Sequence, residues 1–207
     1  SAASDVYKRQ VFEAEKAMEL ADNMGYPVII KASSGGGGKG MRVAGNEQEF
    51  AKLFETAQQE SVHSFSDNTM YLERFVENPR HVEVQILADK YGNVVHLGER
   101  DCSVQRRHQK MIEESPCIAI SDDLRKKMGE TAVRAAKAAG YESAGTIEFL
   151  LDQSGEFYFM EMNTRIQVEH PVTEFVSGVD LIKEQVCIAA GEPLSVQQKD
   201  IELSLIH

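Results

Sequence analysis

The sequence has few cysteines and no long apolar run. Its three cysteines, Cys102, Cys117 and Cys187, form no C-x-x-C pair, and their odd number argues against a disulfide framework. No run of 18 apolar residues occurs, and the N-terminal residues show no charged segment followed by an apolar one. These absences disfavour a membrane span and a secretion signal. We therefore expect reduced thiols and a cytoplasmic protein that does not enter a membrane.

Positive charge is also scarce. The chain has 22 Lys and Arg residues against 33 Asp and Glu residues, a formal net charge of −11. Because general binding to a phosphate backbone needs an excess of cations, we expect no nucleic-acid partner. What the chain does have is a hydrophobic content of 42% over 207 residues, which suffices for one large domain or two small ones.

The two ends of the chain share an unusual property. Residues 5–10 are the translation of the DNA word GATGTGTATAAGAGACAG, and residues 203–207 are the translation of CTGTCTCTTATACAC, the start of its reverse complement. The word is a transposase adapter used in sequencing libraries. We therefore expect residues 1–10 and 203–207 to be non-native tails and leave them out of the fold prediction.

Helix and strand patterns alternate along the rest of the chain. Cap residues such as Asn46 and Ser121 help to predict helices over residues 13–24, 46–60, 121–140 and 180–190. Strands are predicted over residues 27–32, 41–44, 70–76, 82–88 and 94–97, and a hairpin over residues 145–162. The turn-forming segment 89–93 makes strands 82–88 and 94–97 a second, antiparallel hairpin. The pattern predicts a mixed α/β fold.

A glycine-rich segment, residues 33–40, follows one of the predicted strands. Its four consecutive glycines offer backbone amides to phosphate oxygens without a Cβ in the way. It is no Walker A loop, because Gly40 rather than Ser or Thr follows Lys39, and no dinucleotide fingerprint, because a strand-like segment follows it. A glycine flap between two strands remains. Lys31, in the strand before it, is placed to reach the same phosphates as a point charge.

Residues 99–110 are dense in cations although the chain is acidic. Arg106, Arg107, His108 and Lys110 would repel one another unless an anion or nearby carboxylates compensated their charge. Phosphate or a small oxyanion is the natural partner of such a cluster. The alternative is a solvated charged loop.

Glu148 and Glu161 lie on the two strands of the predicted hairpin 145–162. A two-residue turn at Ser154 and Gly155 would place them directly opposite each other, and a four-residue turn would make them diagonal neighbours. Two carboxylates on one face call for a cation, and with Asn163 the oxygen ligands suit Mg²⁺ or Mn²⁺. Phosphate-binding amides, a lysine and a carboxylate-bound metal together indicate a nucleoside triphosphate site.

Three motifs resemble biotin carboxylase: Lys31-Ala32-Ser33 with the glycine flap, residues 100–110, and residues 161–174. The resemblance implies an ATP-grasp fold of the α/β class. Residues 11–75 would form the lid subdomain, residues 76–202 would begin the larger C-terminal antiparallel-sheet subdomain, and ATP would lie between them. It also implies an ATP-dependent carbon–nitrogen ligase that uses bicarbonate to carboxylate biotin on a biotin carrier protein, through carboxyphosphate.

The resemblance also implies roles for individual residues. Binding of ATP falls to Lys31, Gly37, Gly38, Glu73, His81, Gln105 and His108. The divalent metal falls to Glu148, Glu161 and Asn163, and the bicarbonate site to Lys110, Arg165, Gln167 and Val168. Glu169 matches the general base that deprotonates bicarbonate, and Arg165 would also stabilise the biotin enolate. We expect Lys110, Arg165 and Glu169 to carry the catalysis.

The family also implies partner proteins, and protein segments before and after the matching residues. Its members are homodimers that work with a carboxyltransferase, which selects the carboxyl acceptor. They also have a domain before the matching segment and, after it, an arginine that holds biotin. We therefore expect that the 207-residue chain does not turn over alone. Ser34 and Arg74 depart from the family pattern conservatively, so ATP binding is still expected.

Two alternatives remain open. Another ATP-grasp ligase, such as a carbamoyl-phosphate synthetase large subunit, would share the lid and the metal carboxylates but not the form of residues 100–110. A non-catalytic nucleotide-binding or dimerisation module would leave Arg165 and Glu169 without a role. The sequence does not identify the carboxyl acceptor.

Overall fold

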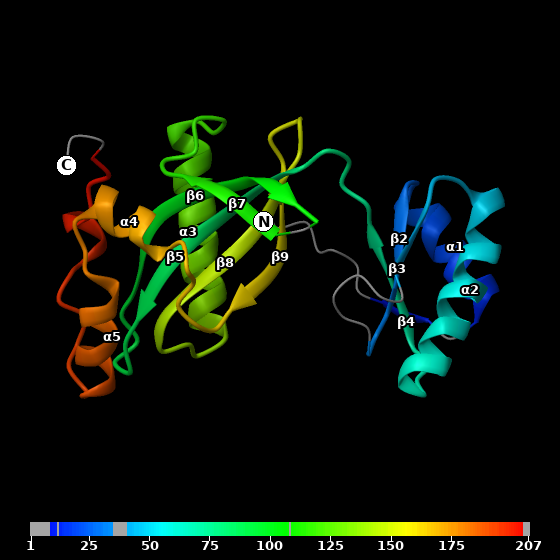
Figure 1. Ribbon diagram of the computed structural model, residues 1–207, viewed down its shortest axis with the longest axis horizontal. Helices are drawn as coiled ribbons and strands as arrows, with labels where there is room; N and C mark the ends of the chain where they lie inside the picture. Colours follow the sequence, from blue (N-terminus) through cyan, green and yellow to red (C-terminus); the bar gives the residue numbers. More distant parts are fainter. Residues whose placement is uncertain (1–8, 12, 35–40, 108, 205–207) are drawn as a thin grey trace. The chain divides into compact units, whose positions relative to one another are not determined.

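The computed structural model describes residues 9–11, 13–34, 41–107 and 109–204, and the chain divides into two compact units. One unit lies within residues 4–77 and the other within residues 78–207. Each has its own antiparallel sheet with helices packed against it (Figure 1). No helix among the described residues is long and apolar enough to span a membrane.

The unit of residues 4–77 is built on a four-stranded sheet in the order β1-β4-β2-β3. Its elements are β1 (Arg9–Val11), α1 (Ala14–Met24), β2 (Val28–Ala32), β3 (Met41–Ala44), α2 (Glu47–Phe65) and β4 (Met70–Arg74). The core between sheet and helices is apolar and includes Ile30, Leu72 and the stacked rings of Phe50 and Phe54. Strand β1 begins inside the segment that the sequence analysis assigns to a non-native tail.

Local signals set the helices of this unit. Asn46 caps α2 by accepting a hydrogen bond from the Glu49 amide at 3.1 Å, as its sequence predicts. Helix α2 continues to Phe65, beyond the predicted end near residue 60, and stops where Ser66 adopts a left-handed backbone. Strands β2 and β3 pair antiparallel on either side of the glycine segment, which confirms the predicted flanking strands. Gly37 and Gly38 themselves lie outside the described residues.

The unit of residues 78–207 is built on a five-stranded sheet in the order β7-β6-β5-β8-β9. Its strands are β5 (Arg80–Ala88), β6 (Val94–Arg106), β7 (Gln109–Glu114), β8 (Ser143–Leu151) and β9 (Phe157–Asn163). Its helices are α3 (Asp122–Ala138), α4 (His170–Ser177) and α5 (Leu181–Ala189), followed by a 3₁₀ turn at Gln198–Asp200. The predicted helices and both hairpins are present, whereas β7 and α4 were not predicted.

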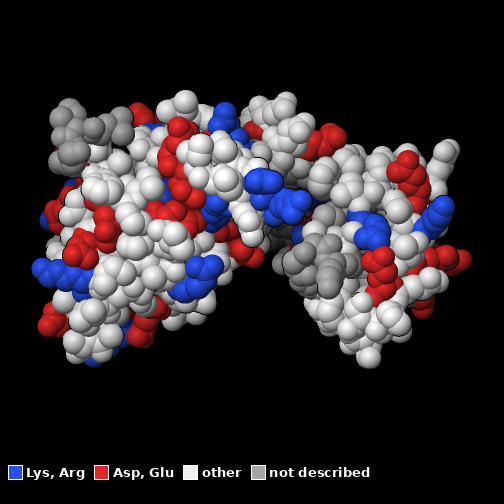
Figure 2. Space-filling view, in the orientation of Figure 1, with Lys and Arg blue, Asp and Glu red and all other residues white. Residues whose placement is uncertain are grey.

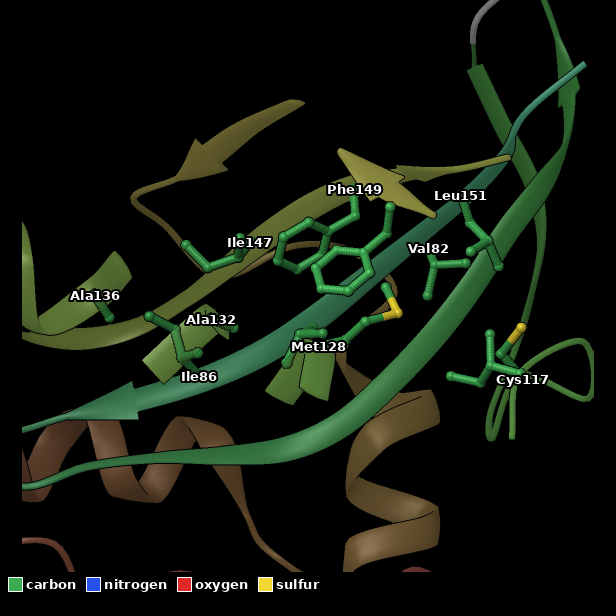
Figure 3. Close-up of a cluster of buried hydrophobic side chains, with 12 residues drawn as sticks. Val82, Ile86, Cys117, Met128, Ala132, Ala136, Ile147, Phe149 and Leu151 are labelled. Carbon is green, nitrogen blue, oxygen red and sulfur yellow. The ribbon is translucent and has the colours of Figure 1, made fainter. Parts of the chain in front are cut away.

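Both faces of this sheet are covered. On one face, α3 packs its Met128 and Ala132 against Val82, Ile86 and other apolar residues of the sheet (Figure 3). On the other face, Leu87 and Leu97 join a second apolar cluster to which α5 contributes Leu181 and Ile188. Because successive residues of a strand point to opposite faces, Glu83 and Gln85 lie on the same side of β5 as Leu87. The polar positions of β5 are therefore buried rather than solvated.

The structure of the charged segment 99–107 differs in part from the solvated loop that the sequence analysis gives as an alternative. The sequence predicts a strand that ends at residue 97 and leaves a solvated loop as one interpretation of the cations that follow. Strand β6 instead runs on to Arg106, and Glu99, Arg100 and Asp101 are buried, so the alternative is wrong for this part of the segment; Arg106 and Arg107 are exposed, as it expects. The physical reason is that each buried charge has an oppositely charged partner, so its burial is compensated.

In the β8–β9 hairpin, Glu148 and Glu161 are paired as predicted, but the turn differs from both predicted turns. Its turn comprises residues 152–156, where Asp152 bonds to Glu156 and Gly155, so neither predicted turn is right. Phe149 pairs with Phe159, and an irregularity between Glu148 and Phe149 then shifts the register by one residue. This bulge places Glu148 directly opposite Glu161.

Candidate functional site

A row of charged residues crosses the sheet of the second unit from strand to strand. Arg100 on β6 is paired with Glu83 on β5, Glu83 with Glu148 on β8, and Glu148 with Glu161 on β9. Residues directly opposite each other in antiparallel strands share a face. The row lies on the face away from α3, because Glu83 is on that side of β5. Three carboxylates and one guanidinium are therefore neighbours on one surface of the sheet.

Lys110 on β7 supplies the second positive charge. Its Nζ donates to Glu148 Oε1 and to Glu169 Oε1, both at 2.8 Å, and also to Glu83. Strand β7 brings Lys110 to this face by pairing it with Gln105 of β6. The structure thus brings together three residues expected to serve catalysis or metal binding, Lys110, Glu148 and Glu169, from well-separated parts of the chain.

Hydrogen bonds and opposite charges hold this cluster in its ionised form, although burial opposes it. Burial by itself would raise the pKa of Glu148, but hydrogen bonds from His81 and Lys110 outweigh it and lower that pKa to about 2. Burial would likewise raise the pKa of Glu169, but the hydrogen bond from Lys110 outweighs it, and the pKa is lowered. Burial would lower the pKa of Lys110, but attraction by Glu83 and bonds to the carboxylates raise it. Both carboxylates and the ammonium are therefore charged at neutral pH.

Two residues expected to bind the nucleotide join the same cluster. The Nε2 atom of His81 is 2.9 Å from Glu148 Oε2, and its Nδ1 is 2.7 Å from Gln105 Nε2. Gln105 is fixed in turn by donating to the carbonyl of Cys102 at 2.8 Å. Since an amide nitrogen only donates, the geometry requires Nδ1 of His81 to accept and Nε2 to carry the proton toward Glu148. His108 lies outside the described residues.

Gln167 and Asn163 complete the surroundings of Glu148. Gln167 Nε2 donates to Glu148 Oε1 at 3.1 Å, and Asn163 Nδ2 donates to the same oxygen at 2.9 Å. Gln167 is buried, while Val168 next to it is 93% exposed. Alternate residues of this segment therefore face the cluster and the solvent.

Arg165 and Glu161 are the charged residues of the predicted set that are exposed, as Val168 is. The guanidinium of Arg165 contacts the Ile166 carbonyl at 3.2 Å, and its side chain is exposed. Glu161 is exposed at the end of the charged row. An exposed arginine two residues before the buried Gln167 can meet an anion from solution, whereas Lys110 is already engaged.

Lys31 and Glu73 meet each other within the first unit. They lie on neighbouring strands β2 and β4, and the Lys31 ammonium forms an ion pair with the Glu73 carboxylate. Both side chains are largely sheltered. Two residues expected to bind different parts of ATP are thus in contact in this structure.

The donor set of the predicted metal site suits a hard cation. Glu148 is an ionised carboxylate, Glu161 is a second carboxylate directly opposite, and the Asn163 amide contacts Glu148. Oxygen donors of this kind fit Mg²⁺ or Mn²⁺ better than a soft metal. The residues present therefore fit the group that the sequence implies.

Sequence reasoning missed two members of the cluster, Glu83 and Arg100. Both are fully buried, and Arg100 Nε donates to Glu83 Oε1 at 2.5 Å. Figure 2 shows acidic and basic side chains scattered over the visible surface, where solvent screens them, but these two are shielded from it. The available signal for Glu83 was its place in β5, where polar residues alternate with apolar ones on a strand that is covered on both faces. Arg100 follows no such pattern, because Glu99 and Asp101 flank it.

Comparison with known proteins defines the class. The family model described as "Carbamoyl-phosphate synthase L chain, ATP binding domain" matches residues 3–197. The chain belongs to this family, and the predicted ATP-grasp fold is confirmed by its structural neighbours.

The individual relatives carry a more specific name. The chain is 60% identical over 189 residues to the biotin carboxylase of Nostoc sp., a match that covers 91% of this chain and 42% of the relative. A biotin carboxylase from Campylobacter jejuni, solved as a β-γ-ATP complex, has a TM-score of 0.86 at 52% identity and covers 96% of this chain and 45% of that one.

A third relative was solved with ligands. The biotin carboxylase domain dimer of the Hydrogenobacter thermophilus 2-oxoglutarate carboxylase, in complex with MgADP, ADP and bicarbonate, has a TM-score of 0.83 at 52% identity. It is covered to 42% of its length, and this chain to 93%. The chain thus spans about two fifths of the length of the relatives that it matches.

Proposed function

We propose that the chain is the ATP-binding part of a biotin carboxylase, an enzyme that uses ATP and bicarbonate to carboxylate biotin on a carrier protein. The observation that supports this most is the contact of Lys110 with Glu169, beside Gln167, in a chain 60% identical to a biotin carboxylase. Charged groups gathered out of water at one place are suited to binding and activating a small anion.

Bicarbonate would bind at Arg165, Gln167 and Lys110, where Lys110 would exchange one of its three carboxylate contacts for the anion. Arg165 can present a planar fork to the planar anion, and Lys110 adds a point charge. Glu169, ionised because its pKa is lowered, would accept the bicarbonate proton. Because a bound anion takes up part of the ammonium charge, it would weaken the hold of Lys110 on Glu169 and raise the affinity of Glu169 for that proton.

The deprotonated oxygen of bicarbonate would then attack the γ-phosphorus of ATP, which gives carboxyphosphate and ADP. Lys31, Glu73, His81 and Gln105 are the described residues that we assign to nucleotide binding. Glu148, Glu161 and Asn163 would hold Mg²⁺ or Mn²⁺, which neutralises phosphate oxygens when bound. Carboxyphosphate would break down to CO₂ and inorganic phosphate beside biotin, and this phosphate would take the ureido N–H proton. Arg165 would stabilise the resulting biotin enolate until its nitrogen attacks CO₂.

The proposal extends to the partners of the protein and to its location in the cell. Carboxylation of a carrier-linked biotin requires a biotin carrier protein, and transfer to the acceptor requires a carboxyltransferase. The Hydrogenobacter thermophilus relative is a domain dimer, which supports a homodimeric parent protein. We also propose a cytoplasmic location.

The test uses a full-length hybrid in which the 189 matched residues of this chain replace their counterparts in the Nostoc biotin carboxylase. We expect a folded hybrid to hydrolyse ATP only with bicarbonate, to respond to free biotin, and to form carboxybiotin from labelled bicarbonate. A folded hybrid without bicarbonate-dependent hydrolysis, measured beside the active Nostoc enzyme, would contradict the proposal.

A carbamoyl-phosphate synthetase type of activity is the second candidate, because the matching family model carries that name. Such an activity also consumes ATP and bicarbonate but needs no biotin. Hydrolysis in the hybrid that is indifferent to biotin, with carbamoyl phosphate formed when ammonia is added, would favour it.

A further inference from the structure

We propose that Arg100, which stands in the motif of residues 100–110 but has no role assigned to it there, is a positioning residue that fixes the segment carrying Glu169 and the orientation of Gln167. The inference rests on the proposed function for its effect on catalysis, but its geometric part stands on the contacts of Arg100 alone. This side chain is among the largest that the structure buries completely.

Every N–H donor of Arg100 has a partner. Its Nε donates to Glu83 Oε1 at 2.5 Å, and its Nη1 donates to Gln85 Oε1 at 2.9 Å and to Thr173 Oγ1 at 2.7 Å. Its Nη2 donates to Thr146 Oγ1 at 3.5 Å and to Gln167 Oε1 at 3.4 Å. A guanidinium has five N–H donors in a fixed plane, so its position is determined by these five acceptors together.

Two of these acceptors flank the proposed general base in the sequence. Gln167 precedes Glu169 by two residues, and Thr173 follows it by four in helix α4. The other acceptors belong to strands β5 and β8. Arg100 therefore ties the segment that carries Glu169, on both sides of that residue, to the middle of the sheet.

Arg100 also determines which way Gln167 points. Because a guanidinium can only donate, it selects the oxygen of the Gln167 amide, and the nitrogen of that amide is then left to face Glu148, at 3.1 Å. The same rule applies to Glu83, whose Oε1 is taken by Arg100 while Oε2 accepts from Lys110. One buried side chain thus orients the amide of Gln167, which we assign to bicarbonate binding, and one oxygen of Glu83, whose other oxygen holds Lys110.

The decisive variant is Arg100→Lys in the full-length hybrid, since a lysine keeps the charge but cannot supply the planar set of donors. We expect kcat/KM for bicarbonate to fall roughly tenfold to a hundredfold, as misplaced catalytic groups do, with the KM for ATP unchanged. A general loss of stability would not separate the two substrates. Arg134→Lys, in an exposed arginine of α3, is the matched control and should leave both parameters unchanged.

A double-mutant cycle tests whether Arg100 acts through Gln167. If it does, Arg100→Lys combined with Gln167→Met lowers kcat/KM for bicarbonate no further than the more harmful single change. Effects that multiply, or an Arg100→Lys protein with unchanged bicarbonate kinetics, would overturn the proposal. Should Arg100→Lys fail to fold, Thr173→Val removes a single acceptor, and an unchanged kcat/KM for bicarbonate in that variant would overturn it as well.

The geometric part has a readout that does not depend on activity. In the 207-residue chain, the side-chain NH₂ resonances of Gln167 should change position and lose protection from hydrogen exchange in Arg100→Lys. Unchanged Gln167 resonances would refute the positioning role. If the hybrid lacks bicarbonate-dependent hydrolysis while these resonances do respond, the proposed function fails and the positioning role of Arg100 stands.

Discussion

The two units of the chain bury different kinds of side chain. Among the described residues of the unit within 4–77, Ser61 is the only buried polar one, and the rest of the buried set is apolar. The unit within 78–207 also has apolar clusters, but between β5, β6 and β8 it buries Glu83, Arg100 and Glu148. The first unit is an ordinary core, and the second combines a core with an ionic network.

The difference indicates where chemistry is built. Taking a charge out of water is costly unless partners compensate it, and a well-packed apolar group is often at least as stabilising as a buried ion pair. The network of Arg100, Lys110 and their carboxylates is therefore weak evidence for stability and better evidence for a site. The apolar unit keeps its ion pairs, such as Lys31 with Glu73 and Arg42 with Glu60, at least partly exposed instead.

The largest expected effect on stability comes from removing one charge of the network. Lys110→Met leaves Glu83, Glu148 and Glu169 without the ammonium that they share, so the free energy of unfolding of the second unit should fall by about 3–5 kcal/mol. Hydrogen exchange of the β5 and β8 amides measures it. Lys126→Met, at an exposed position of α3 in the same unit, is the control; equal effects of the two changes would show that the buried network contributes no more to stability than a surface charge.

Acid should destabilise the second unit more than the first. The pKa of Glu148 falls from an ordinary value near 4.5 to about 2 in the folded protein, so the unfolded chain takes up the proton first as pH falls. The resulting stabilisation, roughly 3 kcal/mol, is complete above about pH 4.5 and is lost as the pH falls toward 2. Hydrogen exchange across this range should show it in β8, and Glu148→Gln should remove it. Identical acid profiles for wild type and variant would count against the network.

Removing a helix cap should lower stability by the same amount in both units, so caps are a feature in which the two units should not differ. Asn46 caps α2 and Ser121 caps α3, each by accepting a hydrogen bond from a backbone amide three residues on. Replacing either by alanine should lower the stability of its own unit by about 1 kcal/mol, and replacing either by aspartate should not. Thermal unfolding of the four variants is the measurement. A several-fold difference in lost stability between the two alanine variants would show that the contribution of a cap also depends on the unit.

The parts of the fold that were predictable from sequence depend on neighbours in the chain. Caps at Asn46 and Ser121, and the turn around Asp89, act within a few residues, and the elements that they define are present. The extension of β6 to Arg106 was not predictable in this way, because its buried charges find their partners on other strands and helices. Helix α4 was missed since Glu169, at its start, forms no side-chain cap.

The site also has a part that could be predicted from sequence and a part that could not. Lys110, Arg165 and Glu169 stand in motifs with a known resemblance, so their roles could be predicted and remain predictions here. Arg100 stands in one of these motifs too, but its contacts with Gln167 and Thr173 join residues more than 60 positions apart. Pairing of this kind follows from strand order and from the bulge beside Glu148, neither of which a local pattern encodes.

The most direct test of the account is Glu169→Gln in the full-length hybrid, followed by the rate of bicarbonate-dependent ATP hydrolysis. The change keeps the size of the side chain and removes the proton acceptor that Lys110 holds in place. We predict that the rate falls about 100-fold or more, with ATP affinity unchanged, as expected for loss of a general base. A variant that hydrolyses ATP at the unaltered rate would contradict the claim that the ionic network around Lys110 activates bicarbonate.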